Sequence, residues 1–350
     1  MTYKILYIED AEPDTIISEI SKEFTVIHHD PKEFEIAINK ITDDIDLLLL
    51  DFRLSDKEAI YDAPTIAQTV RTKNTMNHKN LPIVLISSED NISDFYKDYT
   101  SQDLFDFAVS KKDLLENINK YSSRLKSLIR GYVAISAVNT DIHKNLKQLL
   151  NCPELIAEKL SPRIIETLES EKHTADTYMA SDFILNHIVK PIGILIGEDV
   201  LLSRLGIMKG SKGWEELKTH LEDYRYTGVF KESYNRWWFS GVEDWWKKIS
   251  PEEPSLKRLK ASERKLILEQ KLDINELNVA QKSECSKSEY FWTICAKHQT
   301  PLDPIDGFES VKNTETWEDK EYFSLIAVSE LESLKQITPL SRKRYIEATG

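Results

Sequence analysis

Five short apolar runs alternate with amphipathic segments over roughly the first 112 residues, and this alternation constrains the fold more than any other feature. The apolar runs lie at residues 4–8, 24–29, 45–50, 82–87 and 104–110. Segments with apolar residues at helical spacing lie near 13–22, 32–41, 63–72 and 91–99, and another begins near Asp113. Strict alternation of strand and helix is typical of βαβ units around a parallel sheet. We therefore expect an α/β, doubly wound, five-stranded parallel sheet of the flavodoxin-like type.

Beyond residue 120 the strand signal fades, and helical periodicity replaces it. We expect an α/β domain over residues 1–120, a helical linker over 121–150 and a mainly α-helical second domain over 151–350. The linker could be one long helix or two. Gly131 is the candidate break, because glycine weakens a helix interior by about 1 kcal/mol.

Composition and charge exclude several classes of protein. The chain has 59 Asp and Glu residues and 46 Lys and Arg residues, which gives a net charge of −13. This charge repels a phosphate backbone, so we do not expect nucleic acid as a partner. No apolar run approaches the ~20 residues that cross a bilayer, and the chain start lacks the features of a signal peptide. We therefore expect a cytoplasmic protein with no membrane partner. The 3 cysteines are widely spaced and form no C-x-x-C pair, which favours reduced thiols over a zinc site.

Polar side chains follow four of the expected strands at the point where each strand ends. Glu9 and Asp10 follow the first strand, Asp51 the third, Ser87 the fourth and Lys111 the fifth. Ligands of doubly wound sheets bind beyond the carboxyl ends of the strands. Neighbouring carboxylates repel each other unless a hard divalent cation lies between them, so the pattern predicts a Mg²⁺ site. A carboxylate nucleophile, a metal, a hydroxyl and an ammonium are what phosphoryl transfer onto a carboxylate requires.

The runs KILYIEDAEPD, DLLLLDFRL, LPIVLISS and AVSKKDL together resemble the receiver domain of two-component response regulators, over about residues 3–120. The resemblance implies that a phosphoryl group is accepted by Asp51, contacted by Ser87 and paired with Lys111. It implies that Mg²⁺ is held by Glu9, Asp10, Asp51 and the backbone carbonyl of Arg53. It also implies a histidine kinase or another phosphodonor protein as partner.

Three features depart from the receiver pattern. Lys112 occupies the place where receivers usually have a proline. The segment FRLSDKEAIYDAPTIAQ after the acceptor strand is longer and more acidic than usual. Phe107 precedes Lys111 by four residues, where the aromatic residue of the switch is expected three residues before it. These departures leave open a pseudo-receiver that keeps the fold without the switch.

Two tryptophan pairs are the most distinctive feature of the C-terminal half: Trp237 with Trp238, and Trp245 with Trp246. On a helix, spacings of seven and eight return to one face, so the last three could form a single aromatic stripe. Core packing is the first interpretation. The alternative is a partner-binding surface, because tryptophan is enriched at interface hot spots, and all four are candidate partner-binding residues.

We expect a signalling protein in which Mg²⁺-dependent phosphorylation of Asp51 regulates the contacts of the helical domain with a downstream protein. The helix after residue 113 could support a homodimer. One alternative is a non-phosphorylated scaffold or a phosphate sink within a multi-protein stress or phage-defence system. Another is an enzyme with its site in the C-terminal half, although that half has no Walker A loop, nucleophile elbow or dinucleotide fingerprint.

Overall fold

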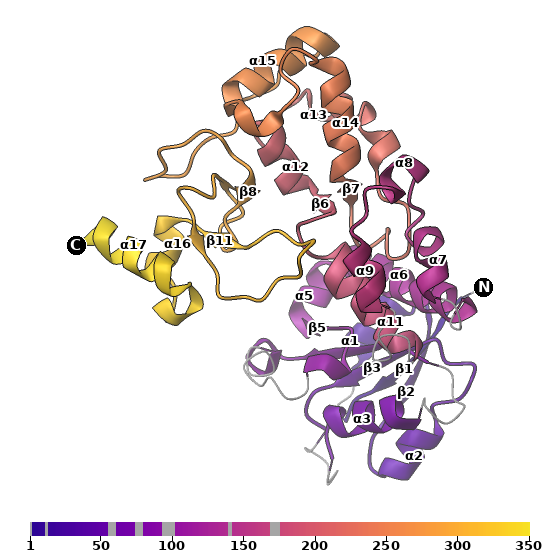
Figure 1. Ribbon diagram of the computed structural model, residues 1–350. Coiled ribbons are helices and arrows are strands. Elements are labelled where there is room, and N and C mark those ends of the chain that lie inside the picture. The colour runs from indigo at the N-terminus through magenta and orange to yellow at the C-terminus, as the bar shows by residue number, and fades with distance from the viewer. Residues whose placement is uncertain are drawn as a thin grey trace. The chain divides into compact units, whose positions relative to one another are not determined.

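The computed structural model describes residues 2–10, 13–54, 61–73, 80–92, 102–138, 142–168 and 176–350. The chain forms two compact units (Figure 1). Unit 1 comprises residues 1–149, 165–185 and 228–233, and unit 2 comprises residues 150–164, 186–227 and 234–350. Each unit is described by itself below.

Unit 1 contains a five-stranded sheet in the order β2-β1-β3-β4-β5, with every neighbouring pair parallel. The strands are β1 (Lys4–Ile8), β2 (Thr25–His29), β3 (Leu47–Asp51), β4 (Ile83–Ser87) and β5 (Phe107–Ser110). The helices along this part of the chain are α1 (Asp14–Ile20), α2 (Phe34–Asn39), α3 (Ala63–Lys73), α5 (Lys111–Glu116) and α6 (Ile118–Ala137). The prediction of a doubly wound, flavodoxin-like parallel sheet is therefore confirmed.

The apolar runs form strands because both faces of this sheet are covered by helices. Strands β3 and β4 are buried along their whole length, as is typical of parallel strands with helices on both sides. On one face, Leu48, Leu50 and Leu85 pack in one hydrophobic cluster with residues of α2 and α3. Helices α1, α5 and α6 contact one another and belong to the other face (Figure 1). Successive side chains of each strand point to opposite faces, so each strand contributes to the hydrophobic cores on both sides of the sheet.

One expected strand begins later than predicted, and one expected helix lies mostly outside the described residues. The fifth strand begins at Phe107 rather than at residue 104, because residues Gln102–Leu104 form a 3-10 turn. Most of the expected helix over residues 91–99 lies outside the described residues.

Gly131 does not break the linker helix. It lies inside α6, which runs without interruption from Ile118 to Ala137. A Cβ atom at Gly131 would lie 2.2 Å from the ring of Phe230, so the glycine makes room for that ring. Close packing, rather than helix termination, accounts for this residue.

The C-terminal region is helical, as expected, and includes short strands that the sequence did not predict. Its helices are α7 (Ile142–Leu149), α8 (Glu154–Ala157), α9 (Pro162–Leu168), α11 (Thr177–Ile184), α12 (Glu198–Leu205), α13 (Trp214–Thr219), α14 (Phe239–Ile249), α15 (Ala261–Leu272), α16 (Leu325–Ser329) and α17 (Pro339–Thr349). Three antiparallel two-stranded sheets pair β6 (Leu195–Gly197) with β7 (Arg236–Trp238), β8 (Thr293–Ile294) with β9 (Pro301–Leu302), and β10 (Phe308–Glu309) with β11 (Tyr322–Phe323).

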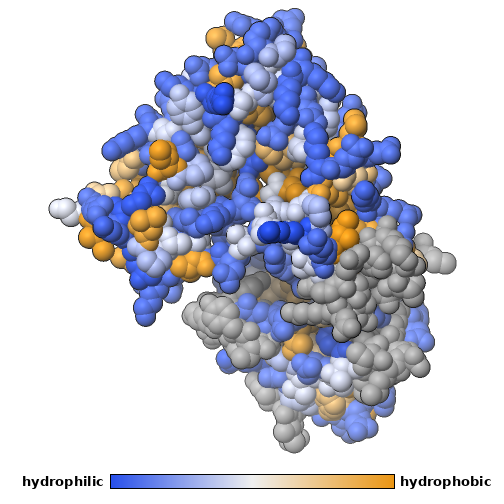
Figure 2. Space-filling model, in the orientation of Figure 1, coloured by the Kyte–Doolittle hydropathy of each residue, from blue (hydrophilic) through white to orange (hydrophobic). Residues whose placement is uncertain are grey.

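Hydrophilic side chains cover most of the surface visible in Figure 2, and apolar residues are scattered among them. Large exposed apolar side chains such as Leu155, Ile305 and Leu340 occur far apart in the sequence. Within the described part of the chain, no helix is both long and apolar enough to pass through a bilayer.

Candidate functional site

The carboxyl ends of β1, β3, β4 and β5 bring the predicted site residues together. The sheet register pairs Ile8 with Leu50, Asp51 with Ile86, and Ser87 with Ser110. Each strand therefore ends at the same edge of the sheet, and the polar residue that ends or follows each strand lies at that edge. This is the edge where doubly wound sheets bind their ligands.

Glu9, Asp10 and Asp51 form a compact carboxylate cluster. One oxygen atom from each lies within 4.8 Å of the others, and the three side chains are buried. Close, buried carboxylates raise one another's electrostatic energy, and a divalent cation with oxygen ligands relieves that repulsion. The cluster therefore fits Mg²⁺.

Lys111 reaches into the same cluster from the first residue of α5. Its Nζ lies 2.5 Å from Oε2 of Glu9 and 3.3 Å from Oδ1 of Asp51. Burial alone would lower the pKa of this ammonium, but its hydrogen bond to Glu9 and the charges of Asp51 and Glu9 raise the pKa instead. The lysine is therefore charged at neutral pH and is held beside the predicted acceptor. The place usually taken by proline is filled by Lys112, which forms an ion pair with Glu89 and leaves Lys111 in the site.

The carboxyl group of Asp51 is harder to ionise than an ordinary aspartate. Burial, followed by the negative charge of Glu9, raises the pKa of Asp51 from 3.8 to about 6. Lys111 and a hydrogen bond from Ser87 act in the opposite direction. At neutral pH the group is an anion in an environment that favours neutralisation, by a cation or by a covalent substituent.

Two further residues support the site, and the sequence reasoning missed both. The hydroxyl of Tyr7 donates a hydrogen bond of 2.9 Å to Glu9 Oε2, and burial raises the pKa of Tyr7 far above its usual value, so the donor stays protonated. Its signal was present, because residues two apart on a strand share a face. Asn91 donates to Ser87 Oγ at 3.0 Å, and no sequence pattern indicated this contact.

The remaining receiver-like features are only partly visible. Arg53 is exposed and follows the end of β3 by two residues. Residues 55–60, within the long acidic segment, lie outside the described part of the chain.

Phe107 and Ala108 lie on opposite faces of β5. Ala108 holds the position three residues before Lys111, where the aromatic residue is expected. Ala108, three positions before Lys111, packs with the cluster that includes α2 and α3. The ring of Phe107 instead stacks on Tyr121 of α6 at 6.3 Å, and the guanidinium of Arg124 lies 3.8 Å from its centre. A displacement of one residue along a strand reverses the face, which explains this arrangement.

Trp238, Trp245 and Trp246 do not form the single helical stripe that their spacing allows. Trp237 and Trp238 lie on β7, whereas Trp245 and Trp246 lie on α14. All four side chains are buried, with at most 7% exposed, and three of them belong to one hydrophobic cluster with residues of α12. Their burial favours the first interpretation, core packing, over the alternative of a partner-binding surface.

Comparisons with known proteins concern the N-terminal part of the chain. No family profile and no curated protein matches it. Solved structures that resemble it include an adenylate cyclase from Rhodopirellula baltica, with 12% identity over 40% of this chain and 99% of that chain, at a TM-score of 0.33.

A putative response regulator from Chloroflexus aurantiacus has 17% identity over 35% of this chain and 100% of that one, at a TM-score of 0.27. The receiver domain of Ssk1 from Saccharomyces cerevisiae, solved with the histidine phosphotransfer protein Ypd1, has 16% identity over 36% of this chain and 88% of that one, at a TM-score of 0.28.

Proposed function

We propose that the protein is a signalling protein that accepts a phosphoryl group on Asp51 from a phosphodonor protein such as a histidine kinase. The observation that carries the proposal is the convergence of Asp51 with Glu9, Asp10, Ser87 and Lys111 at one edge of the sheet. These side chains come from four strand ends, and each supplies a group that phosphoryl transfer onto a carboxylate uses.

The transfer itself is a displacement at phosphorus. An oxygen of the Asp51 carboxylate forms a bond to phosphorus, and the bond from phosphorus to the donor's imidazole nitrogen breaks with its electron pair leaving on the imidazole. Lys111 Nζ already lies 3.3 Å from Asp51 Oδ1, and Ser87 bonds to the same carboxyl, so both can contact the phosphoryl oxygens. Mg²⁺ held by Glu9, Asp10, Asp51 and the Arg53 carbonyl would neutralise part of the phosphoryl charge.

Phosphorylation would then act through local electrostatics. The phosphoryl group brings a charge of about −2 into a site where Lys111 now bridges two carboxylates. Lys111 and Ser87 would turn towards the new oxygens, and this shift would change how the helical C-terminal region contacts a downstream protein.

The position of Phe107, whose ring packs on Tyr121 of α6, favours a second candidate, a receiver-like domain that binds proteins without being switched by phosphorylation. The two candidates differ in whether Asp51 reacts, so one measurement separates them.

The test is intact-mass spectrometry of the full chain after incubation with acetyl phosphate and Mg²⁺. We expect a labile gain of one phosphoryl group in the wild type, and none in Asp51→Ala or without a divalent cation. Asp90→Asn is the matched control, because Asp90 is an exposed carboxylate near the end of β4 and lies outside the cluster. A wild type that gains no mass, and that shows no Mg²⁺ binding by titration, would leave the scaffold as the better account.

A further inference from the structure

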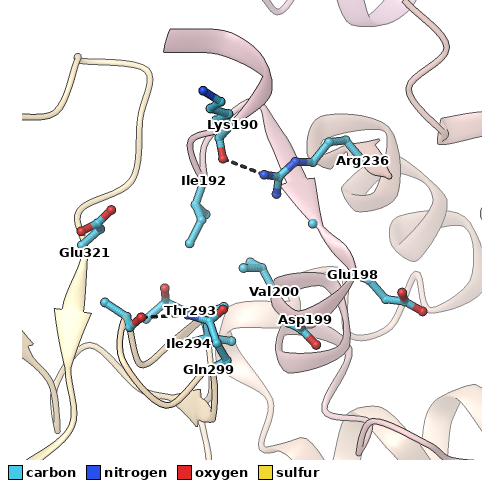
Figure 3. Close-up of a pocket in the computed structure, with 12 residues that line it drawn as sticks. Lys190, Ile192, Glu198, Asp199, Val200, Arg236, Thr293, Ile294, Gln299 and Glu321 are labelled. Atoms are coloured by element: carbon cyan, nitrogen blue, oxygen red, sulfur yellow. Dashed lines mark hydrogen bonds between the residues drawn. The ribbon is translucent and has the colours of Figure 1, made fainter. Parts of the chain in front are cut away.

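Unit 2 contains a pocket of about 430 Å³, far from Asp51 in the sequence (Figure 3). Its lining combines apolar side chains, among them Ile192, Val200 and Ile294, with charged and polar ones such as Lys190, Arg236 and Thr293. A pocket of this size with an apolar wall and a few polar groups is typical of small-molecule sites.

The guanidinium of Arg236 is the most informative group in this pocket. Its Nη2 donates to the backbone carbonyl of Lys190 at 2.7 Å, as the dashed line in Figure 3 shows. It forms no ion pair with a carboxylate of the described residues. Burial lowers the pKa of the guanidinium, and the nearby Tyr234 raises it by a smaller amount. A largely buried cation without a counter-charge is costly, and an anion bound beside it would remove that cost.

The acidic side chains of the pocket have partners of their own. Asp199 forms an ion pair with Lys209 at 2.8 Å, and Glu321 forms one with Lys312 at 2.5 Å. Glu198 accepts a hydrogen bond from the indole of Trp214, and its carboxylate points away from the middle of the pocket in Figure 3. With these carboxylates engaged elsewhere, the positive charge of Arg236 is available to a ligand in the pocket.

The local fold places Arg236 against the start of a helix. Gly197 and Arg236 are register partners in the β6–β7 pair, and Gly197 is also the residue that precedes α12. A Cβ atom at Gly197 would lie 2.5 Å from Nη1 of Arg236, so the guanidinium packs directly against the backbone of this glycine. The first backbone N–H groups of α12 add positive potential beside the arginine.

A second polar group points independently to a ligand. Thr293 is 2% exposed and lines the pocket, and its Oγ1 has no hydrogen-bond partner among the residues that the structure describes. Its backbone carbonyl, in contrast, accepts a hydrogen bond from Ser203. Buried hydroxyl groups are nearly always hydrogen-bonded. The Oγ1 atom of Thr293 is itself buried, so it would bind a ligand atom after rotation of the side chain towards the pocket.

We propose that this pocket binds a small organic anion whose carboxylate or phosphate group pairs with Arg236, while Thr293 bonds to a second polar atom of the same molecule. The apolar wall of Ile192, Val200 and Ile294 contacts the carbon skeleton. This site would give the protein a ligand-binding function separate from the chemistry at Asp51, and the proposal does not depend on that chemistry.

The test is isothermal titration calorimetry of the full chain with three probes at constant ionic strength: inorganic phosphate, AMP and succinate. EDTA is present throughout, so that no divalent cation draws phosphate to the acidic cluster near Asp51. We expect at least one probe to bind the wild type with a Kd below about 1 mM. Preference for phosphate or AMP would identify a phosphate ligand, and preference for succinate a carboxylate ligand.

Substitutions then assign the binding to this pocket. We expect Arg236→Gln to weaken the binding probe by about 10- to 100-fold and Thr293→Val by about 5- to 10-fold, as for lost hydrogen bonds to a charged and a neutral group. Arg225→Gln is the matched control, because Arg225 is exposed, pairs with Glu222 and does not line the pocket. The proposal is overturned if no probe binds the wild type with a Kd below about 1 mM, or if a folded Arg236→Gln binds as tightly as the wild type.

A footprint on the wild type keeps the proposal testable if Arg236→Gln fails to fold. Phenylglyoxal modifies arginine side chains, and peptide mass spectrometry reports the rate at each position. We expect the binding probe to protect Arg236 and to leave the rate at Arg225 unchanged. Equal rates at Arg236 with and without the probe would contradict the assignment.

Discussion

Replacing Asp51 by asparagine should stabilise the protein at neutral pH when no divalent cation is present. The folded protein raises the pKa of this carboxyl from 3.8 to about 6, chiefly by burial. Between these two values the folded state binds more protons than the unfolded state, so the stability of the wild type falls as pH rises through this window. A difference of about two pKa units between the folded and unfolded states lowers the free energy of unfolding by about 3 kcal/mol above pH 6.

The neutral amide of Asp51→Asn avoids this cost, but it weakens one contact of Lys111, which keeps its partner Glu9. We therefore expect a net gain of about 1–3 kcal/mol in the free energy of unfolding at pH 7.5 in EDTA. The gain should shrink to about 1 kcal/mol or less at pH 4.5, where the folded carboxyl is already protonated. Mg²⁺ should reverse the order, because it binds only when the acceptor carboxylate is present and stabilises the wild type by mass action.

Equilibrium urea unfolding followed by circular dichroism measures these differences for the wild type, Asp51→Asn and the control Asp90→Asn. The control should match the wild type under every condition, since Asp90 is exposed. If Asp51→Asn is as stable as the wild type or less stable at pH 7.5 in EDTA, the electrostatic account of this site is wrong.

Three further substitutions test other parts of unit 1 by the same unfolding assay. Arg71→Met should cost about 3–5 kcal/mol, because Arg71 pairs with the buried Asp106 at 3.2 Å and its loss leaves that carboxylate uncompensated; an unchanged midpoint would contradict this. Gly131→Ala should cost about 1–3 kcal/mol through its clash with Phe230, and a stabilising effect, as ordinary helix propensity gives, would refute that explanation. Phe107→Ala should cost about 3–5 kcal/mol and leave the phosphorylation rate of Asp51 unchanged, because the buried ring packs on α6 away from the acids; a tenfold slower rate by intact mass would show that the ring takes part in the transfer.

The sheet and its site could be predicted from the sequence because parallel strands carry both signals locally. Strands that are buried on both faces have continuous apolar sequences, and the four leucines before Asp51 are an example. The carboxyl ends of such strands meet at one edge by topology, so residues far apart in sequence, such as Asp51 and Lys111, can be assigned to one site without coordinates. The supporting contact from Asn91 to Ser87 depends on how one turn folds back, and no periodic pattern encodes it.

Local rules failed where tertiary packing decided the outcome. Glycine has a low helix propensity, but at position 131 the contact with Phe230 outweighs that cost, and α6 continues. Helical periodicity likewise grouped Trp238 with Trp245 and Trp246, although the chain changes from strand to helix at Phe239. Burial of the indoles, which the sequence alone could not show, decides between a core and a docking surface.

The pocket in unit 2 illustrates the limit of sequence reasoning most clearly. Gly197 and Arg236 meet because β6 and β7 pair, and each of these strands has only 3 residues, too few for alternation to be recognised. Thr293 comes from another short strand, again without a periodic signal. The two halves of the chain therefore differ in how they encode a site: the parallel sheet places its acids by a topology that the sequence displays, whereas the C-terminal region places its arginine by pairings that only the structure reveals.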